Sequence, residues 1–225
     1  LGLEDENLLG RGETLGVLYT EDVDRSGIGA FFFDPAVGGS AWRLNLDAAD
    51  NDDGHRVDLH LRRPFRSLEE RSSRGLRLTS DDRIQPLFDA GSRVAEFRQR
   101  SRSGQLHVAR STGRVNGHVR RWRVGLDWWD LTFDRAPGVL QPARLPSDRR
   151  AAYPFVAVET IEDDFVPIAN LALIGRPQDL HLGRRLTAKL GLSPDALGAD
   201  DGRVLLEASW RDGIRPRESV IVTGA

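Results

Sequence analysis

The feature that most constrains the fold of this chain is an alternation of apolar and polar residues with a period of two. One such run begins at Trp42 and a second begins at Val57, and the turn-rich segment 50–54 separates them. Residues two apart in a strand share one face of the sheet. The two runs therefore predict a hairpin with one apolar face and one charged face.

The same alternation recurs at Trp122–Trp128 and at Leu180–Leu190, where Arg184 interrupts the apolar parity. A Pro- and Arg-rich stretch at Leu131–Arg150 predicts the longest surface loop. We expect about ten or eleven antiparallel strands, each near the length that a tilted barrel strand needs. Weaker patterns predict strands at Glu13–Thr20, Gly27–Phe33, Arg71–Ser80, Val94–Arg110, Ala151–Thr160, Val204–Trp210 and from Glu218 to the end of the chain.

Composition removes several classes of protein. The chain has no Cys, which excludes disulfides and thiolate metal sites. A net charge of −2 gives no reason to expect a nucleic-acid partner. No apolar run approaches the length of a transmembrane helix. The chain begins at Leu1 and has no Met, so we expect a fragment or a processed product.

Two architectures share this alternation, namely a soluble sandwich and a membrane barrel. Two features favour the barrel: the polar parity combines Arg with Asp and Glu, and aromatic residues such as Trp42, Trp128, Trp129 and Tyr153 lie near strand ends, where an interfacial girdle would place them. The barrel interpretation predicts that the following residues face lipid: Trp42, Leu44, Leu46, Val57, Leu59, Leu61, Trp122, Val124, Leu126 and Trp128.

The histidines do not suggest a metal or catalytic site. None of the five lies in an HExxH motif. His55 and His60 have opposite parity on a strand, so they cannot share a metal ion. His60 and His181 fall on the polar parity, which predicts that they line a lumen.

Carboxylates and glycines have equally simple interpretations. The segment 50–54 contains three Asp before Gly54 but lacks the spacing of an EF-hand, so a hairpin turn explains it, with weak cation binding as the alternative. The acidic cluster Glu159, Glu162, Asp163 and Asp164 is expected to pair with arginines. Gly10, Gly12 and Gly16 do not form a GxGxxG phosphate loop. We predict no catalytic, cofactor or metal site and no enzymatic activity.

Three short motifs resemble a known family. The segment Asn7–Glu13 reads Asn-Leu-Leu-Gly-Arg-Gly-Glu, Asp34-Pro35 is followed by a Gly-Gly-Ser, and Arg63-Pro64-Phe65 follows the hairpin. In this order and spacing they resemble the barrel of the bacterial surface-antigen family, the BamA/TamA type of outer-membrane assembly factor. The family's Arg-Gly-Phe/Tyr loop motif is missing, and Gly213-Ile214-Arg215 does not match it.

The resemblance implies an all-β antiparallel transmembrane barrel in the outer membrane of a Gram-negative bacterium. Residues 1–225 would form a single partial barrel domain, its N-terminal portion. Family barrels have about sixteen strands, within the range of outer-membrane barrels. We therefore expect the upstream POTRA domains and the remaining strands to lie outside this chain. The implied partners are the lipid bilayer, unfolded outer-membrane or secreted clients, and periplasmic accessory proteins.

The implied activity is insertion, assembly or translocation of outer-membrane proteins, without bond chemistry. The strand Glu13, Thr14, Leu15, Gly16, Val17, Leu18, Tyr19, Thr20 would be the first of the barrel and would pair weakly with the last to form a lateral seam. Two alternatives within the superfamily stay open, a two-partner secretion pore and the anchor of a fused patatin-like lipase. A soluble β-sandwich binding module is the alternative from another class.

Overall fold

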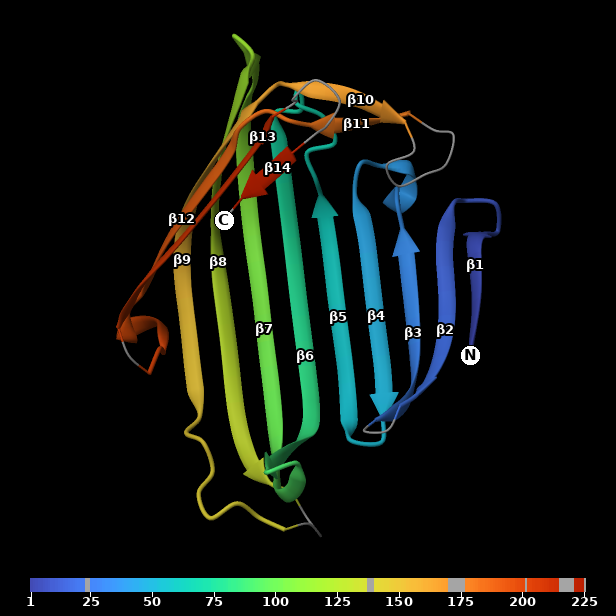
Figure 1. The fold of residues 1–225 in the computed structure, drawn as a ribbon, viewed down its shortest axis with the longest axis vertical. Helices are drawn as coiled ribbons and strands as arrows, with labels where there is room; N and C mark the ends of the chain where they lie inside the picture. The colour runs from blue at the N-terminus through green and yellow to red at the C-terminus, as the bar shows by residue number, and fades with distance from the viewer. Residues whose placement is uncertain (23–24, 137–139, 170–176, 201, 215–220, 225) are drawn as a thin grey trace.

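The computed structural model describes residues 1–22, 25–136, 140–169, 177–200, 202–214 and 221–224. Within them the chain is all-β and builds one antiparallel sheet of 12 strands, with a separate two-stranded sheet (Figure 1). The all-β, antiparallel prediction is thus confirmed. No helix among the described residues has the length and apolar character needed to cross a membrane.

The large sheet is a meander in which nearly every strand pairs with its neighbours in sequence. Its strands are β1 (Gly2–Leu8), β2 (Glu13–Glu21), β3 (Ser26–Asp34), β4 (Arg43–Asn51), β5 (Gly54–Arg63), β6 (Ser72–Asp89), β7 (Ser92–Val115), β8 (His118–Arg135), β9 (Arg149–Glu162), β12 (Arg185–Ser193), β13 (Arg203–Ile214) and β14 (Ile221–Gly224). The hairpin of β10 (Phe165–Ala169) and β11 (Pro177–His181) lies between β9 and β12 in sequence and crosses one end of the sheet (Figure 1).

The sheet is open among the described strands. β1 and β14 are its two edges, and no pairing joins them into a closed barrel. In Figure 1 the sheet curls on the side of β9, β12 and β13, so that β13 and β14 pass in front of β7 and β8. The curl brings side chains of non-adjacent strands together on one face.

The largest buried cluster lies on the polar face, defined as the face that carries Asp58, Asp127 and Glu159. Burial on β9 alternates, with Ala151, Tyr153, Phe155 and Ala157 buried. Trp129 and Leu205 pack against this cluster from β8 and β13. Since the curl makes this the concave side, aromatic rings fill the space between converging strands.

Glycines on the strands provide room for these rings. A Cβ on Gly125 would lie 2.6 Å from the ring of Phe155, and one on Gly16 would lie 2.3 Å from the ring of Phe31. Each ring therefore lies directly over a glycine on the neighbouring strand, a packing that no larger residue allows. Gly16, predicted to weaken a seam, has this packing role in the structure.

Two observed strands, β1 and β10, were not predicted, and one predicted strand is wrong. The first strand is β1, which the sequence analysis did not predict, because Gly2–Leu8 is acidic and has no apolar alternation. It is exposed almost throughout, and backbone pairing with β2 holds it. The predicted single strand Leu180–Leu190 is wrong: β11 ends at His181 and β12 begins at Arg185.

Strand boundaries also differ at the long loop. β8 extends to Arg135 and β9 begins at Arg149, so both ends of the predicted loop Leu131–Arg150 are strand.

Two further strand boundaries also differ from the prediction. Trp42 precedes β4 and does not belong to it. The predicted start of the last strand at Glu218 lies outside the described residues, and β14 begins at Ile221.

Candidate lipid-facing surface and the polar face behind it

The strand registers place the predicted lipid-facing residues on one side of the sheet, except Trp42, which precedes β4 and has no register. Leu44 pairs with Leu61, and Leu46 pairs with Leu59 across β4 and β5. The register continues through Leu76 and Leu106 to Leu126 on β8. We call this side the apolar face. It runs from Leu15 and Val17 on β2 to Val204, Leu206 and Trp210 on β13.

Many large apolar side chains of this face are open to the surroundings. Of the predicted set, Leu46, Val57, Trp122, Val124 and Leu126 are exposed, and the other five are partly buried. Outside that set the exposed members include Leu15, Val17, Tyr19, Ile28, Leu78, Leu106, Val108, Val156, Leu186, Leu190, Leu192, Val204, Leu206 and Trp210. Contact with lipid stays a prediction, and soluble monomers rarely expose large contiguous apolar patches.

The apolar band has defined margins. On β8 it runs from Trp122 to Trp128, and on the same face Arg120 precedes it and Asp130 follows it. At a rise of about 3.3 Å per residue, the six steps between the two tryptophans span about 20 Å before tilt. Indole rings at both margins of an apolar band are typical of membrane interfaces.

Two of the four aromatic residues predicted for a girdle lie elsewhere. Trp129 and Tyr153 are on the polar face, where Tyr153 is 8% exposed and Trp129 packs beside it. The reason is alternation, because Trp128 and Trp129 are neighbours on one strand and must point to opposite faces.

The polar face holds carboxylates in specific contacts. Asp58 is 7% exposed, and it accepts hydrogen bonds from Arg77 Nε at 3.1 Å and Thr79 Oγ1 at 2.7 Å. Both donors come from β6, next to Asp58 on β5. A charge withdrawn from solvent in this way is tolerated because it is paired and hydrogen-bonded.

Arg121 on β8 connects three parts of this face. Its guanidinium lies 4.3 Å from the ring centroid of Phe65, donates to the carbonyl of Ser67 at 3.2 Å, and donates to Glu159 Oε2 at 3.2 Å. Arg185 Nε on β12 donates to the other oxygen of Glu159 at 2.8 Å. The β5–β6 loop is thereby folded across the polar face onto β8 and β9, which sequence patterns did not predict.

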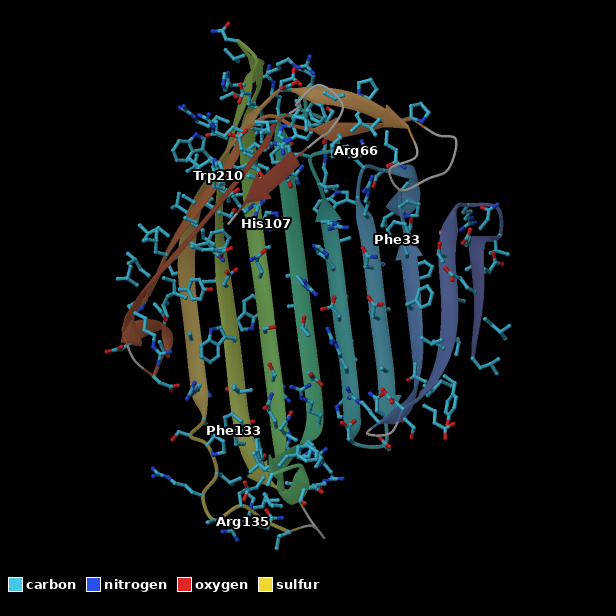
Figure 2. All side chains as sticks on the ribbon, viewed as in Figure 1. Phe33, Arg66, His107, Phe133, Arg135 and Trp210 are labelled. Carbon is cyan, nitrogen blue, oxygen red and sulfur yellow. The ribbon has the colours of Figure 1, made fainter. Side chains whose placement is uncertain are left out.

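A second ion-pair group lies on the extensions of β6, β7 and β8, beyond the apolar band. Arg98 donates to both oxygens of Asp82, at 2.7 Å and 3.0 Å, and Arg100 bridges Asp82 and Asp134. The hydrogen bonds from Arg98 lower the pKa of Asp82, and the same contact raises the pKa of Arg98. Figure 2 labels Phe133 and Arg135 at this end of β8.

The predicted seam strand is not at the edge of the sheet. β2 contains all of Glu13–Thr20 and is paired on both sides, with β1 through Val17 to Leu3 and with β3 through Val17 to Ala30. The free edge on this side belongs to β1. The prediction of a first strand at Glu13 is therefore corrected, because acidic β1 adds one more strand through backbone hydrogen bonds.

The histidines separate as their parity indicated, with one exception. His55 pairs with Asp50 and His60 with Asn45, so they face opposite sides. His107 on β7, labelled in Figure 2, lies over Gly75, its partner on β6, on the polar face. His181 is on β11, outside the large sheet, where its Nε2 is 2.6 Å from the carbonyl oxygen of Glu162. That His181 lines a lumen stays a prediction.

Several carboxylates of the other candidate sites are engaged within the fold. Asp52 accepts hydrogen bonds from the backbone and hydroxyl of Ser26, and Asp53 pairs with Arg25 at 2.8 Å. In the acidic cluster Glu159 pairs with two arginines and Asp163 with Arg114. Among the residues that the structure describes, no group of three His, Asp or Glu side chains is placed to hold a metal ion.

The three segments that carry the family resemblance are three connections at the same end of the sheet (Figure 1). In the first, Asn7 Oδ1 accepts from the amide of Gly12 at 2.7 Å, and Gly10 and Gly12 have positive φ. In the second, Asp34 Oδ1 accepts from the amide of Ala36 at 2.8 Å. The third carries Phe65 beneath Arg121. No protein-family model matches the chain, and no curated protein is similar to it in sequence.

Proposed function

We propose that this chain forms part of an outer-membrane β-barrel that inserts, assembles or translocates other outer-membrane proteins. The observation that carries the membrane part is the inverted polarity of the sheet. Its apolar side chains are exposed, while charged residues such as Asp58 and Asp127 are buried on the opposite face. Exposed apolar side chains are stable in contact with lipid, and charged side chains are stable in contact with the water of a barrel lumen.

The competing soluble sandwich gains less support from this geometry. A sandwich buries its apolar face against a second sheet about 10 Å away. The only other sheet among the described residues is the β10–β11 hairpin, and it pairs five residues with five at one end of the molecule. It leaves the apolar residues of β4 to β8 exposed.

The assembly part rests on the resemblance and on the open edge. The resembling segments form ordered turns in sequence order at one end of the sheet. β1 presents an unpaired backbone edge, which can accept a strand from another chain by β-augmentation. In this proposal a client strand pairs with β1, and the seam between β1 and the closing strand of the intact barrel opens to admit it. The two alternatives, a two-partner secretion pore and the anchor of a fused lipase, would use the same barrel for a different function.

Spin labels test the membrane part. Nitroxides at Leu44→Cys and Asn45→Cys in the intact protein, reconstituted in lipid vesicles, should differ in accessibility, because the two side chains face opposite sides of the sheet. This chain has no native Cys that would compete for the label. We expect the label at 44 to be relaxed by oxygen dissolved in lipid and the label at 45 by a water-soluble relaxant. Equal exposure of both labels to the aqueous relaxant would refute the membrane proposal.

Cross-linking tests the assembly part separately. A photoreactive residue at Glu4 on edge strand β1 should capture outer-membrane clients during their insertion, because Glu4 is exposed beside the free edge. The matched position is Asp47 on interior strand β4, which is exposed but paired on both sides. Capture at both positions alike, or at neither, would contradict strand templating by β1.

A further inference from the structure

One margin of the apolar face carries a row of arginines. Each lies two residues beyond the last apolar residue of its strand, at the end of the sheet where Figure 2 labels Arg66. The row crosses four neighbouring strands and consists of Arg63 on β5, Arg74 on β6, Arg110 on β7 and Arg120 on β8.

None of these four guanidinium groups forms an ion pair or hydrogen bond with the described residues. Arg63 and Arg74 are directly opposite each other in the register, an arrangement of like charges that is unfavourable without a counter-charge. The carboxylates nearest in sequence are already engaged, since Glu70 pairs with Arg66 and Glu69 with Arg114.

A hollow lies within this row. It has a volume of about 340 Å³, and Arg74 and Arg110 line it together with Trp122, Val108 and Val124. Arg110 pairs with Trp122, and Arg74 pairs with Val108. The hollow therefore has a cationic end on the margin and an apolar end that continues into the exposed band. We call it the Arg74–Arg110 groove.

We propose that the Arg74–Arg110 groove binds an acidic glycerophospholipid, with the lipid phosphate between the two guanidinium groups and an acyl chain along Val108 and Val124. Guanidinium groups bind phosphate oxygens through paired, charge-assisted hydrogen bonds, and basic pockets at membrane interfaces hold anionic head groups. The apolar end favours an amphiphile over a free anion. Two uncompensated cations favour a lipid with net negative charge over a zwitterionic one. This inference rests on the proposed membrane location.

Native mass spectrometry of the intact protein tests the groove. The protein is released from nanodiscs that contain equal amounts of phosphatidylglycerol and phosphatidylcholine, and the retained lipids are counted. We expect wild type to retain phosphatidylglycerol selectively and the double variant Arg74→Gln, Arg110→Gln to lose this selectivity. Each interfacial arginine is worth about a five-fold preference, so the pair gives roughly 25-fold.

The matched control is Arg56→Gln, Arg123→Gln. It removes the same charge from two exposed arginines of the polar face, which have no ion pair among the described residues. Retained selectivity in this control supports the groove. Equal loss of selectivity in both double variants would mean that net charge alone determines lipid selectivity, and it would overturn the proposal. Full selectivity in the Arg74, Arg110 variant would overturn it as well. If the spin label at Leu44 sees lipid while selectivity is unchanged, only the groove fails; if that label sees water, the membrane proposal fails as well.

Discussion

Lys189 on β12 reaches over β9 to Asp127 on β8, and its Nζ lies 2.5 Å from Asp127 Oδ2 although the two strands are not paired. On its way the ammonium lies 4.5 Å from the ring centroid of Phe155 and 5.6 Å from that of Tyr153. A contact that skips one strand requires the sheet to be concave on this side. This ion pair therefore stabilises the curved conformation of the sheet at the aromatic cluster.

Removing one partner of this pair should destabilise the fold. The Asp127 side chain is 11% exposed and that of Lys189 is 21% exposed. Lys189→Met would leave a largely buried carboxylate without its cation, at a cost of about 3 kcal/mol. Unfolding in urea, with the protein in lipid vesicles, measures the loss. The double variant Lys189→Met, Asp127→Asn should recover part of it, and strictly additive losses would show that the two residues do not interact.

Charge on the apolar face should be costly. Leu44→Arg places a guanidinium among Leu46, Leu59 and Leu61, and in a membrane this costs about 2–4 kcal/mol near the midplane. Asn45→Arg is the matched variant, because it adds the same charge one residue along the strand on the polar face. We expect Leu44→Arg to reduce the folded, membrane-integrated fraction strongly and Asn45→Arg to reduce it little. Equal effects would argue against lipid on the Leu44 side.

Asp82 should make stability depend on pH in a defined direction. Its pKa in the folded chain is below the ordinary value of 3.8, chiefly because Arg98 donates hydrogen bonds to it. The pair therefore stabilises the fold fully above about pH 4, and this contribution disappears as the pH falls through the lowered folded pKa. Asp82→Asn should lower the free energy of unfolding by about 1–2 kcal/mol near neutral pH. The loss is no larger because Arg98 is partly exposed and solvent screens the ion pair.

The difference in stability between wild type and Asp82→Asn should shrink in acid, whereas Asp89→Asn, at an exposed strand end, should change little at any pH. Denaturant unfolding between pH 2.5 and pH 7 follows both variants. A difference for Asp82→Asn that stays constant across this range would contradict the assigned ion pair.

The 225-residue chain by itself should not be a soluble monomer. In water its exposed apolar face is an aggregation surface, and the edges at β1 and β14 leave backbone groups open to pairing with other chains. We expect sedimentation without detergent to show large or heterogeneous species. A compact, cooperatively unfolding monomer in plain buffer would contradict the membrane proposal and favour the sandwich.

The period-two pattern was sufficient to predict most of the strands and their two faces. Apolar and polar residues alternate over 43–48 on β4, over 56–62 on β5 and over 121–128 on β8, so the pairing of Leu44 with Leu61 follows from the turn between the first two. The pattern did not predict β1, whose acidic residues carry no alternation. It also did not predict the outer parts of β6 to β8, where charged residues such as Asp82 and Arg98 stand at positions that are apolar in the middle of the strands. There the backbone ladder and ion pairs hold the strands.

What the sequence by itself determined is the identity of the two faces, because side-chain direction in a strand depends only on parity. Tertiary structure decided which face is buried, since burial depends on the curl of the whole sheet. That curl places Tyr153 and Phe155 inside, lets Lys189 reach Asp127, and folds the loop of Phe65 onto Arg121. These contacts join strands far apart along the chain, and no local pattern encodes the distance between strands that are not neighbours.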